Sequence, residues 1–260
     1  MFKKDRTILL SFDVEEFDLP MEYGINISDD EQMHVGKNGL DAIHGILEDL
    51  KIQCTLFTTA SFALKFPSKI VDLSERHEIA SHTFFHSSFK KDDLINSRLV
   101  LENITSKKIF GLRMPRMKNI DTSLIEEAGY KYDSSINPTW LPGRYNNLSR
   151  PRTCYDENGI TKFPVSVSAN LRIPLFWLAF KNLPYFYYRK IALQSLKKDG
   201  YLCIYFHPWE FIDLHKYKIP VIIKRKSGNA LLEKLNRLIS DLKNEGDFIS
   251  RYSFLDKKKR

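Results

Sequence analysis

The stretch TILLSFDVEEFD, residues 7–18, begins as an apolar run and ends in acids. Its first half, residues 7–12, has the short, continuous hydrophobicity of a buried β-strand. Asp13 and Glu15 come directly after it. On an extended chain, residues two apart project to the same side. This stretch therefore predicts a buried strand with two carboxylates side by side at its carboxyl end.

Similar strand-like runs recur along the chain, and segments of helical periodicity separate them. Apolar residues recur at helical spacing in residues 40–50, in residues 94–104 and again after residue 228. Alternating strands and helices favour a parallel sheet covered by helices. We expect one α/β domain over residues 1–260, ending in a helix and a basic tail within 228–260. The further strands are expected at residues 54–58, 78–81, 109–113, 162–165 and 201–206.

Reactive side chains follow these strands at their carboxyl ends. His82 and His86 come after the third expected strand, Arg113 closes the fourth, and His207 ends the last. A βα barrel gathers such residues at one rim, whereas an open sheet binds ligands at a single switch point. The sequence has neither a GxGxxG nor a GxxxxGK[ST] phosphate loop. The pattern favours a barrel with its active site at that rim.

The two histidines and an acid suit a metal ion. His82 and His86 can present both imidazoles to one ion if the segment between them makes a helical turn. Two histidines with one carboxylate suit Zn²⁺, although Fe(II) uses similar donors. The alternative to a metal site is that one histidine is buried and hydrogen-bonded and the other is exposed to solvent. His207 can act as an acid or base near pH 7, and Arg113 beside Asp13 would keep that carboxylate ionised.

Five motifs, taken together, resemble those of the polysaccharide deacetylase family, the NodB-homology domain of carbohydrate esterase family 4-like proteins. They occur in the family's order and span residues 7–210. The resemblance implies a distorted (β/α) barrel, usually of seven strands, which holds a divalent metal, often zinc, and hydrolyses N-acetyl or O-acetyl groups of sugars. The motifs are Phe12-Asp13-Val14-Glu15, His82-Thr83-Phe84-Phe85-His86, Arg113-Met114-Pro115, Asp133-Ser134-Ser135 and His207-Pro208-Trp209-Glu210.

The resemblance also implies a role for individual residues. Asp13 would be the catalytic base, Arg113 the residue that positions it, and His207 the general acid. The implied metal ligands are Glu15, His82 and His86, and the expected substrate contacts are Pro115, Asp133 and Trp209. Many family members carry two adjacent aspartates where Val14 intervenes here. This leaves open whether Glu15 or Glu16 binds the metal, and whether the substrate is a sugar or a small cyclic amide or ureide, as in allantoinase-like members.

The charge and composition of the chain limit the classes of partner that it can bind. Forty Lys and Arg against 32 Asp and Glu leave a formal charge of +8, which permits anionic partners. The apolar stretch near the N-terminus is too short for a signal peptide, so we expect a cytoplasmic protein acting on nucleotide-linked or lipid-linked N-acetyl sugars in surface polysaccharide or glycolipid synthesis. We expect no nucleic-acid partner. The alternative from another class is a non-catalytic basic module that binds glycans or nucleic acid.

An unusually aromatic segment occupies residues 171–188. Its prolines and length forbid a membrane span. We interpret it first as a buried helix with its flanking turn. The alternative is an exposed patch that stacks on sugars or makes peripheral contact with a lipid carrier at a membrane.

Overall fold

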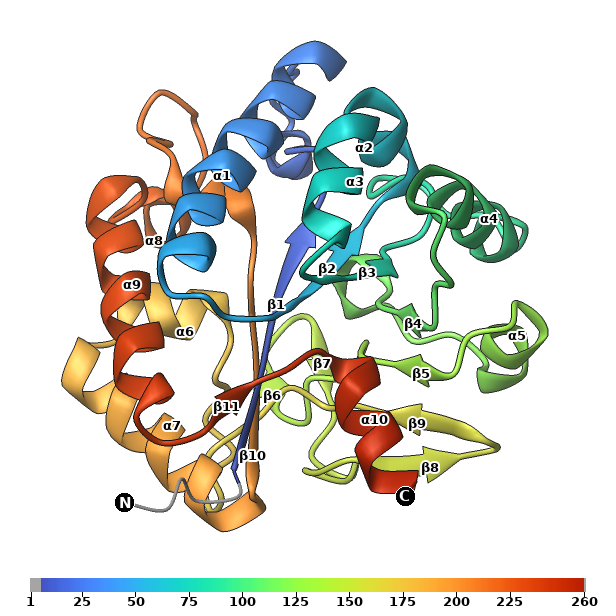
Figure 1. The fold of residues 1–260 in the computed structure, drawn as a ribbon. Coiled ribbons are helices and arrows are strands. Elements are labelled where there is room, and N and C mark those ends of the chain that lie inside the picture. The colour runs from blue at the N-terminus through green and yellow to red at the C-terminus, as the bar shows by residue number, and fades with distance from the viewer. Residues whose placement is uncertain (1–5, 260) are drawn as a thin grey trace.

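A strongly curled, mostly parallel sheet forms the centre of the computed structural model, which describes residues 6–259 (Figure 1). In this part of the chain the sheet has nine strands, in the order β10-β1-β2-β3-β4-β5-β9-β8 with β11 beside β1. The family resemblance predicts seven strands, so the observed number is slightly larger. The strands are β1 (Thr7–Val14), β2 (Thr55–Thr58), β3 (Glu78–Ser81), β4 (Gly111–Leu112), β5 (Tyr132–Asp133), β8 (Tyr155–Glu157), β9 (Ile160–Lys162), β10 (Tyr201–Phe206) and β11 (Asp247–Phe248).

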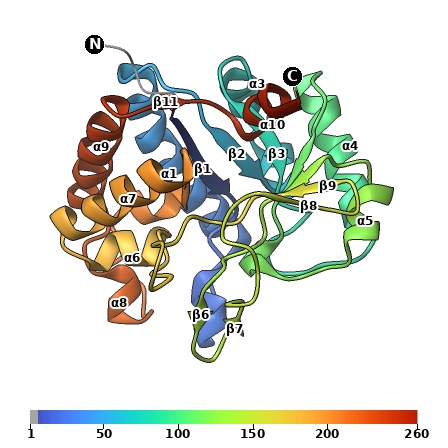
Figure 2. The ribbon, with the colours of Figure 1, turned by 90° about the horizontal axis from the view of Figure 1, so that it is seen from below.

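The helices cover the outside of the curl (Figures 1 and 2). The longest, α1, begins where the Ser28 side chain accepts a hydrogen bond from the Glu31 amide, and α9 buries one leucine-rich face. None of the described helices is both long and apolar enough to cross a membrane. The helices are α1 (Asp29–Asp49), α2 (Ala60–Lys65), α3 (Pro67–Ser74), α4 (Asp93–Thr105), α5 (Thr122–Glu127), α6 (Trp177–Asn182), α7 (Tyr185–Asp199), α8 (Val221–Lys224), α9 (Asn229–Lys243) and α10 (Arg251–Lys259).

The strand β1 lies between β10 and β2 and is buried on both faces. Ile8, Leu10 and Phe12 pack against the helices, whereas Leu9 belongs to a second cluster inside the curl. Because side chains alternate along a strand, Asp13 falls on the inner face with Leu9. The alternation of side chains along β1 thus places the Asp13 carboxylate inside the curled sheet.

The curl closes without a complete ladder of strand pairs. The segment after β9 approaches β10, and the Ser166 amide donates to the Cys203 carbonyl at 2.8 Å. The Cys203 amide donates in turn to the Ser166 hydroxyl at 2.9 Å. These bonds join the two edges of the curled sheet. The result is the distorted barrel expected from the family resemblance.

At the opposite end from the strand carboxyl termini, α10 closes the curl. The Arg251 amide donates to the Thr55 hydroxyl, and the ring of Tyr252 stacks on Phe110 with centroids 3.9 Å apart. The segment expected as a basic tail is therefore helical from residue 251 to residue 259, and Arg251 is fully buried within it. Arg260 lies outside the described residues.

Two glycines bring α1 against the end of the sheet at which β1 and β10 finish. A Cβ atom on Gly36 would lie 2.3 Å from the Glu15 carbonyl oxygen. A Cβ atom on Gly39 would lie 2.1 Å from the Pro208 carbonyl oxygen. The absence of side chains at these two positions lets one helix touch both the end of β1 and the turn after β10.

Candidate active site

The carboxyl ends of β1, β3 and β10 meet around one cavity of about 370 Å³. This volume falls within the range of about 300–1,000 Å³ typical of ligand sites. The strand-end positions predicted from the sequence therefore do converge. The predicted residues that line the cavity are Asp13, Glu15, His82, His86, His207 and Trp209.

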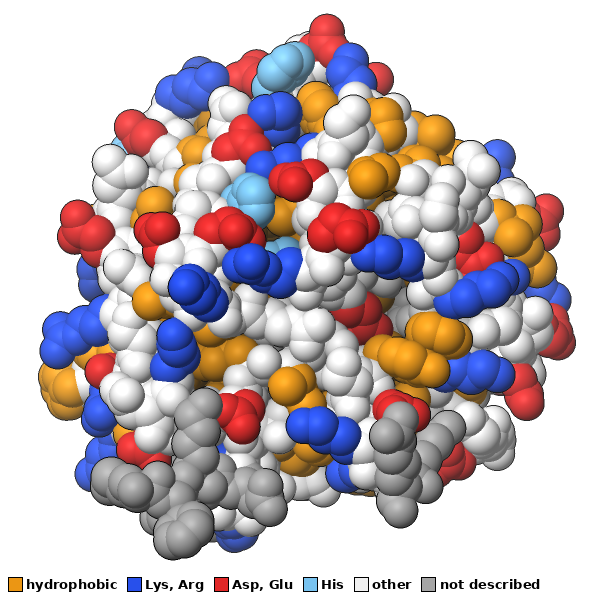
Figure 3. Space-filling model, in the orientation of Figure 1, with side chains coloured by type: hydrophobic (Ala, Val, Ile, Leu, Met, Phe, Trp, Pro, Cys, Tyr) orange, Lys and Arg blue, Asp and Glu red, His pale blue; other side chains and the backbone are white. Residues whose placement is uncertain are grey.

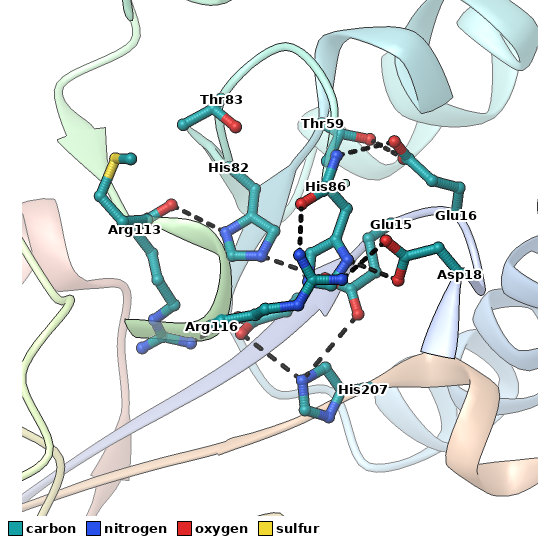
Figure 4. A network of polar contacts seen from close by, with 12 residues as sticks. Glu15, Glu16, Asp18, Thr59, His82, Thr83, His86, Arg113, Arg116 and His207 are labelled. Carbon is teal, nitrogen blue, oxygen red and sulfur yellow. Dashed lines mark hydrogen bonds and ion pairs between the residues drawn. The ribbon is translucent and has the colours of Figure 1, made fainter. Parts of the chain in front are cut away.

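Glu15, His82 and His86 form a tight cluster within this cavity (Figure 4). Glu15 Oε2 lies 3.0 Å from His82 Nε2 and 3.3 Å from His86 Nε2. One donor atom from each residue lies within 4.8 Å of the other two. The three side chains, which come from two strand ends 67 and more residues apart in the numbering, can therefore share one ion.

Hydrogen bonds on the far side of each imidazole fix its orientation. His82 Nδ1 lies 2.8 Å from the Arg113 carbonyl oxygen, and His86 Nδ1 lies 2.7 Å from Asp18 Oδ1. A carbonyl and a carboxylate can only accept, so both Nδ1 atoms carry the proton. In the neutral form each ring directs its Nε2 lone pair toward Glu15, which is the usual arrangement of metal-binding histidines.

This donor set fits a divalent metal ion. Glu15 Oε2 is buried and receives no well-directed hydrogen bond from the described residues. Two Nε2 lone pairs face a carboxylate oxygen, which is unfavourable unless a cation lies between them. In the protein alone, burial opposes charge on His86, but Glu15 and Asp18 outweigh it and raise the pKa of His86 to about 9. A proton or a metal ion can satisfy the cluster.

The loop between the two histidines is not the helical turn that the sequence analysis considered. Residues 82–86 have no helical hydrogen bonds, and Thr83 adopts a left-handed conformation with φ of 64°. The imidazoles nevertheless lie nearly parallel, with ring centroids 5.7 Å apart. A tight irregular turn therefore replaces the helix as the device that brings both rings to the same side.

Glu16 shapes this loop and does not join the cluster. Its carboxylate accepts hydrogen bonds from the His86 amide at 2.8 Å and from the Thr59 and Ser61 hydroxyls. Of the two acids left open by the sequence, Glu15 is the one whose carboxylate faces the histidines (Figure 4).

Asp13 is paired with Arg113 on the inner face of the sheet. Arg113 Nη1 donates to Asp13 Oδ1 at 2.5 Å, and the guanidinium is fully buried. Further bonds to Ser134 and contacts with the rings of Phe57 and Tyr205 hold the guanidinium in place. The ion pair fixes one oxygen of Asp13 and leaves the other directed toward the cavity.

His207 faces Asp13 and Glu15 from the opposite side. Its Nε2 lies 3.9 Å from Asp13 Oδ2 and 4.0 Å from Glu15 Oε1. Its Nδ1 lies 3.2 Å from Glu210 Oε1. Burial disfavours the imidazolium, but the hydrogen bond to Glu210 and the nearby carboxylates prevail and raise the pKa of His207.

Glu210 is itself part of a buried ion pair that the sequence analysis missed. Its Oε2 lies 3.3 Å from Lys181 Nζ, and both side chains are fully buried. Lys181 also donates to the Ile223 carbonyl at 2.8 Å. The pair links α6, α8 and His207, three parts of the chain that no short-range sequence signal connects.

Asp18 and Arg116 also escaped the sequence analysis. Asp18 holds His86 and accepts a second hydrogen bond from Arg116 at 3.0 Å. Arg116 reaches over the cluster to Glu22, with Nε 2.5 Å from Oε1. The run of acids after β1 was a visible signal for Asp18. The position of Arg116 depends on its left-handed backbone, with φ of 55°.

The three expected substrate contacts occupy different places. Trp209 lines the cavity, donates from Nε1 to Glu15 Oε1 at 3.0 Å and stacks on His207. Pro115 and Asp133 do not line the cavity. The Asp133 carboxylate instead pairs with Lys162 at 3.0 Å. Of the three, Trp209 alone is placed to touch a substrate directly.

The aromatic segment at residues 171–188 divides among core, cavity and surface, where Leu171 is 79% exposed and Phe186 is 73% exposed. Phe180 and Tyr188 are fully buried, as the first interpretation expects. Phe176, Trp177 and Leu178 line the cavity. The start of α6 and the residue before it therefore supply part of the aromatic wall of the cavity.

Comparison with known proteins finds similarity at the level of structure. No protein-family model matches the chain, and no curated protein sequence matches it either. Solved structures do match. One, from Mycobacterium smegmatis and described as a polysaccharide deacetylase, has a TM-score of 0.67 and 18% identity over 99% of this chain and 91% of its own.

Two further structures agree. One from Pseudomonas aeruginosa PAO1, also described as a polysaccharide deacetylase, has a TM-score of 0.69 and 15% identity, covering 97% of this chain and 91% of its own. The Puue allantoinase has a TM-score of 0.65 and 19% identity, covering 96% and 89%. The chain thus has the NodB-like fold seen in polysaccharide deacetylases, as its five motifs predict.

Proposed function

We propose that this chain, which has the NodB-like fold, is a metal-dependent hydrolase that removes acetyl groups from N-acetylated sugars. One observation carries the proposal. A cluster fit for a cation, Glu15 with His82 and His86, lies across one cavity from a held carboxylate, Asp13, and from His207. Metal-assisted acyl transfer to water uses these three parts: a Lewis acid, a base and an acid.

Glu15, His82 and His86 would hold the metal ion, for which we favour zinc. When bound, this ion would polarise the acetyl carbonyl and make a water molecule acidic enough to lose its proton near neutral pH. The remaining steps are assigned to side chains of the chain itself.

Asp13 would accept the proton from the attacking water. Arg113 engages Asp13 Oδ1, so Oδ2 is the oxygen that faces the cavity and His207. A carboxylate held by a buried guanidinium cannot turn away from the reacting atoms. Arg113 holds Asp13 from the side that faces away from the cavity, and it does not itself line the cavity.

His207 would donate a proton to the nitrogen of the leaving amine as the C–N bond breaks and acetate forms. A general acid must carry its proton at the working pH. The raised pKa of His207, which Glu210 and the facing carboxylates produce against the effect of burial, meets this requirement. The Glu210 carboxylate also accepts a hydrogen bond from the His207 amide at 2.8 Å. Glu210 therefore fixes the backbone of His207 and also stabilises the protonated imidazole.

An acetate-release assay tests the proposal. The purified chain should be loaded with Zn²⁺ and given N-acetyl sugars in polymeric, nucleotide-linked and lipid-linked form. Release of acetate together with a free amine supports the proposal. Absence of both products with every substrate, from protein that carries one metal ion per chain, would contradict it.

A second candidate is hydrolysis of a small cyclic amide or ureide. The similarity to the Puue allantoinase favours it, since that structure covers nearly the whole chain. The same metal site and the same acid and base would serve this reaction. Ring opening of allantoin without acetate release from sugars would select this candidate.

A non-catalytic role is the third. The paired arrangement of Asp13 with Arg113 and of His207 with Glu210 argues against it, because a binding module has no need of a held base and acid.

A further inference from the structure

Two exposed segments flank the mouth of the cavity. One is the hairpin of β6 (Trp140–Leu141) and β7 (Tyr145–Asn146), and the other is the segment 216–226, which contains α8. Leu141 from the hairpin and Ile222 from α8 both line the cavity. Figure 2 shows the hairpin and α8 projecting at the same lower edge of the molecule.

Each segment presents a large apolar side chain to solvent. Trp140 is 60% exposed and Val221 is 66% exposed, and neither lines the cavity. Ile222 is half exposed beside Val221. Met21 and Tyr23, in the turn after β1, add further exposed apolar surface, and Tyr23 also lines the cavity. Apolar groups gathered at the rim of a polar site, in contact with water, mark an interaction surface.

The same rim is strongly basic. The segment 216–226 has the sequence KYKIPVIIKRK, with five cations and no acid. Lys216 pairs with Glu31, and the nearest acid in sequence, Asp213, is held by His215. By contrast, the face in Figure 3 carries cations and acids side by side. Part of the positive balance of the chain is thus concentrated next to the cavity mouth, around exposed Val221.

The pattern of residues within each segment is that of a membrane interface. Val221 and Ile222 lie between Lys218 on one side and Lys224 on the other. In the hairpin, Trp140 is followed four residues later by Arg144, whose half-exposed side chain also pairs with Glu22. Tryptophan is enriched at the level of lipid headgroups, and basic residues beside apolar ones bind anionic lipid.

We propose that the hairpin Trp140–Asn146 and the segment 216–226 dock on an anionic lipid bilayer, so that the cavity opens toward the lipid headgroups. A soluble polyanion would engage the cations but would give the exposed tryptophan and valine nothing to bury, and this favours the bilayer. In combination with the proposed function, on which this second step rests, the substrate is an N-acetyl sugar linked to a lipid that stays in the membrane. The membrane contact that the sequence analysis gave as an alternative for residues 171–188 is proposed here for other segments.

Vesicle flotation tests the docking without reference to activity. The full chain is mixed with vesicles of phosphatidylcholine alone or of phosphatidylcholine with about one-third phosphatidylglycerol, in a range at which anionic lipid attracts basic segments. We expect binding to the anionic vesicles only, and its loss at high salt. The variant Trp140→Ser/Val221→Ser should bind at least about tenfold more weakly, because it loses the apolar anchors.

Matched variants separate the two contributions. Ile95→Ser/Leu99→Ser removes two half-exposed apolar side chains from α4, far from the cavity mouth, and should bind as the unaltered chain does. Lys218→Gln/Lys226→Gln should weaken binding by about fivefold per lysine. Thermal unfolding of each variant checks that it is folded.

Three outcomes would overturn the docking proposal: no binding to anionic vesicles, equal losses in the rim and α4 variants, or binding to a soluble polyanion such as heparin with none to vesicles. Acetate release from a soluble N-acetyl oligosaccharide is measured on the same preparations. If Trp140→Ser/Val221→Ser retains that rate while losing vesicle binding, both proposals stand. If no preparation releases acetate but the anionic vesicles still bind, the proposed function fails and the docking surface remains.

Discussion

Arg113 donates a hydrogen bond to Asp13 at 2.5 Å inside the sheet, where the guanidinium has no contact with solvent and the carboxylate has almost none. A buried ion pair is weak evidence of stability, because desolvation offsets much of its attraction. Its value here is geometric, since the pair presents one fixed carboxylate oxygen to the cavity. The pair therefore ties the position of the candidate base, at the end of β1, to Arg113, which directly follows β4.

Replacement of the base tests this role. Asp13→Asn should lower the rate of acetate release by about 10² to 10⁴, the usual contribution of general base catalysis. Metal content should stay near that of the unaltered chain, because the substitution leaves Glu15, His82 and His86 intact. Metal analysis and initial rates on the same sample check both parts. A normal rate would remove Asp13 from the mechanism.

Replacement of a histidine in the cluster should act on the metal. His86→Gln removes one donor and leaves Asp18 with only Arg116 as a partner. We expect the bound metal per chain to fall at least about tenfold at low free Zn²⁺, with activity lost in parallel. The control is His34→Gln, on the exposed face of α1, which should bind metal normally. Equal metal content in both variants would contradict the assignment.

Glu210 should control the pH dependence of activity. Because Glu210 raises the pKa of His207, Glu210→Gln should lower that pKa, so the imidazole loses its proton at lower pH. For a general acid, the alkaline limb of the kcat/KM profile should then shift to lower pH. An unchanged limb would show that Glu210 does not tune His207.

That variant also leaves Lys181 buried without its carboxylate partner, which is destabilising by several kcal/mol in comparable cases, about 3–5 kcal/mol. The double variant Lys181→Met/Glu210→Gln removes both charges and should recover most of the stability while keeping the shifted pH profile. Urea unfolding and kinetics together separate the structural effect from the catalytic one.

Glycines in one helix provide a matched pair for packing. Gly39→Ala places a methyl group against the Pro208 carbonyl, so we expect a loss of about 1–3 kcal/mol in unfolding free energy and reduced activity as the His207 turn moves. Gly45→Ala in the same helix meets no atom within 4 Å and should stabilise the chain by up to about 1 kcal/mol. Urea unfolding measures both. Equal effects of the two substitutions would contradict the close approach at Gly39.

His77 should make the fold sensitive to mild acid. Burial lowers the pKa of His77 to about 4, below its ordinary value of 6.5. Between these values the unfolded chain binds the proton more readily than the folded one, so stability falls as pH drops from 6.5 to 4, by at most about 1.4 kcal/mol per pH unit for this group. His77→Gln should remove that part of the slope. The exposed His215→Gln serves as the control, and identical slopes in all three chains would refute the prediction.

The sequence was sufficient to predict which residues meet at the cavity, because their positions follow from the strands that carry them. Asp13, His82 and His207 each come at a strand end, and parallel strands of one sheet bring such ends together. The alternation along β1 also predicted that Asp13 and Glu15 would share a side. These arguments need only the strand period and the order of elements.

The supporting residues could not be predicted in the same way. Lys181 meets Glu210 through the packing of α6 against the turn after β10, which no local pattern encodes. The turn from His82 to His86 depends on the left-handed conformation of Thr83, a residue type that rarely adopts it. The spacing of four residues suggested a helix because helical spacing is the commonest reason for that separation.

The central place of β1 has a consequence for how the chain reaches this state. β1 pairs with β10 (Figure 1). The Ser11 hydroxyl donates to the Ile204 carbonyl, 193 residues away in the sequence. Until β10 arrives, β1, which is buried on both faces in the finished sheet, exposes an unpaired edge. Pairings between such distant segments slow folding, and open edges in partly folded chains promote aggregation. Refolding yields should therefore rise when the protein is dilute, because self-association competes with a slow intramolecular closure.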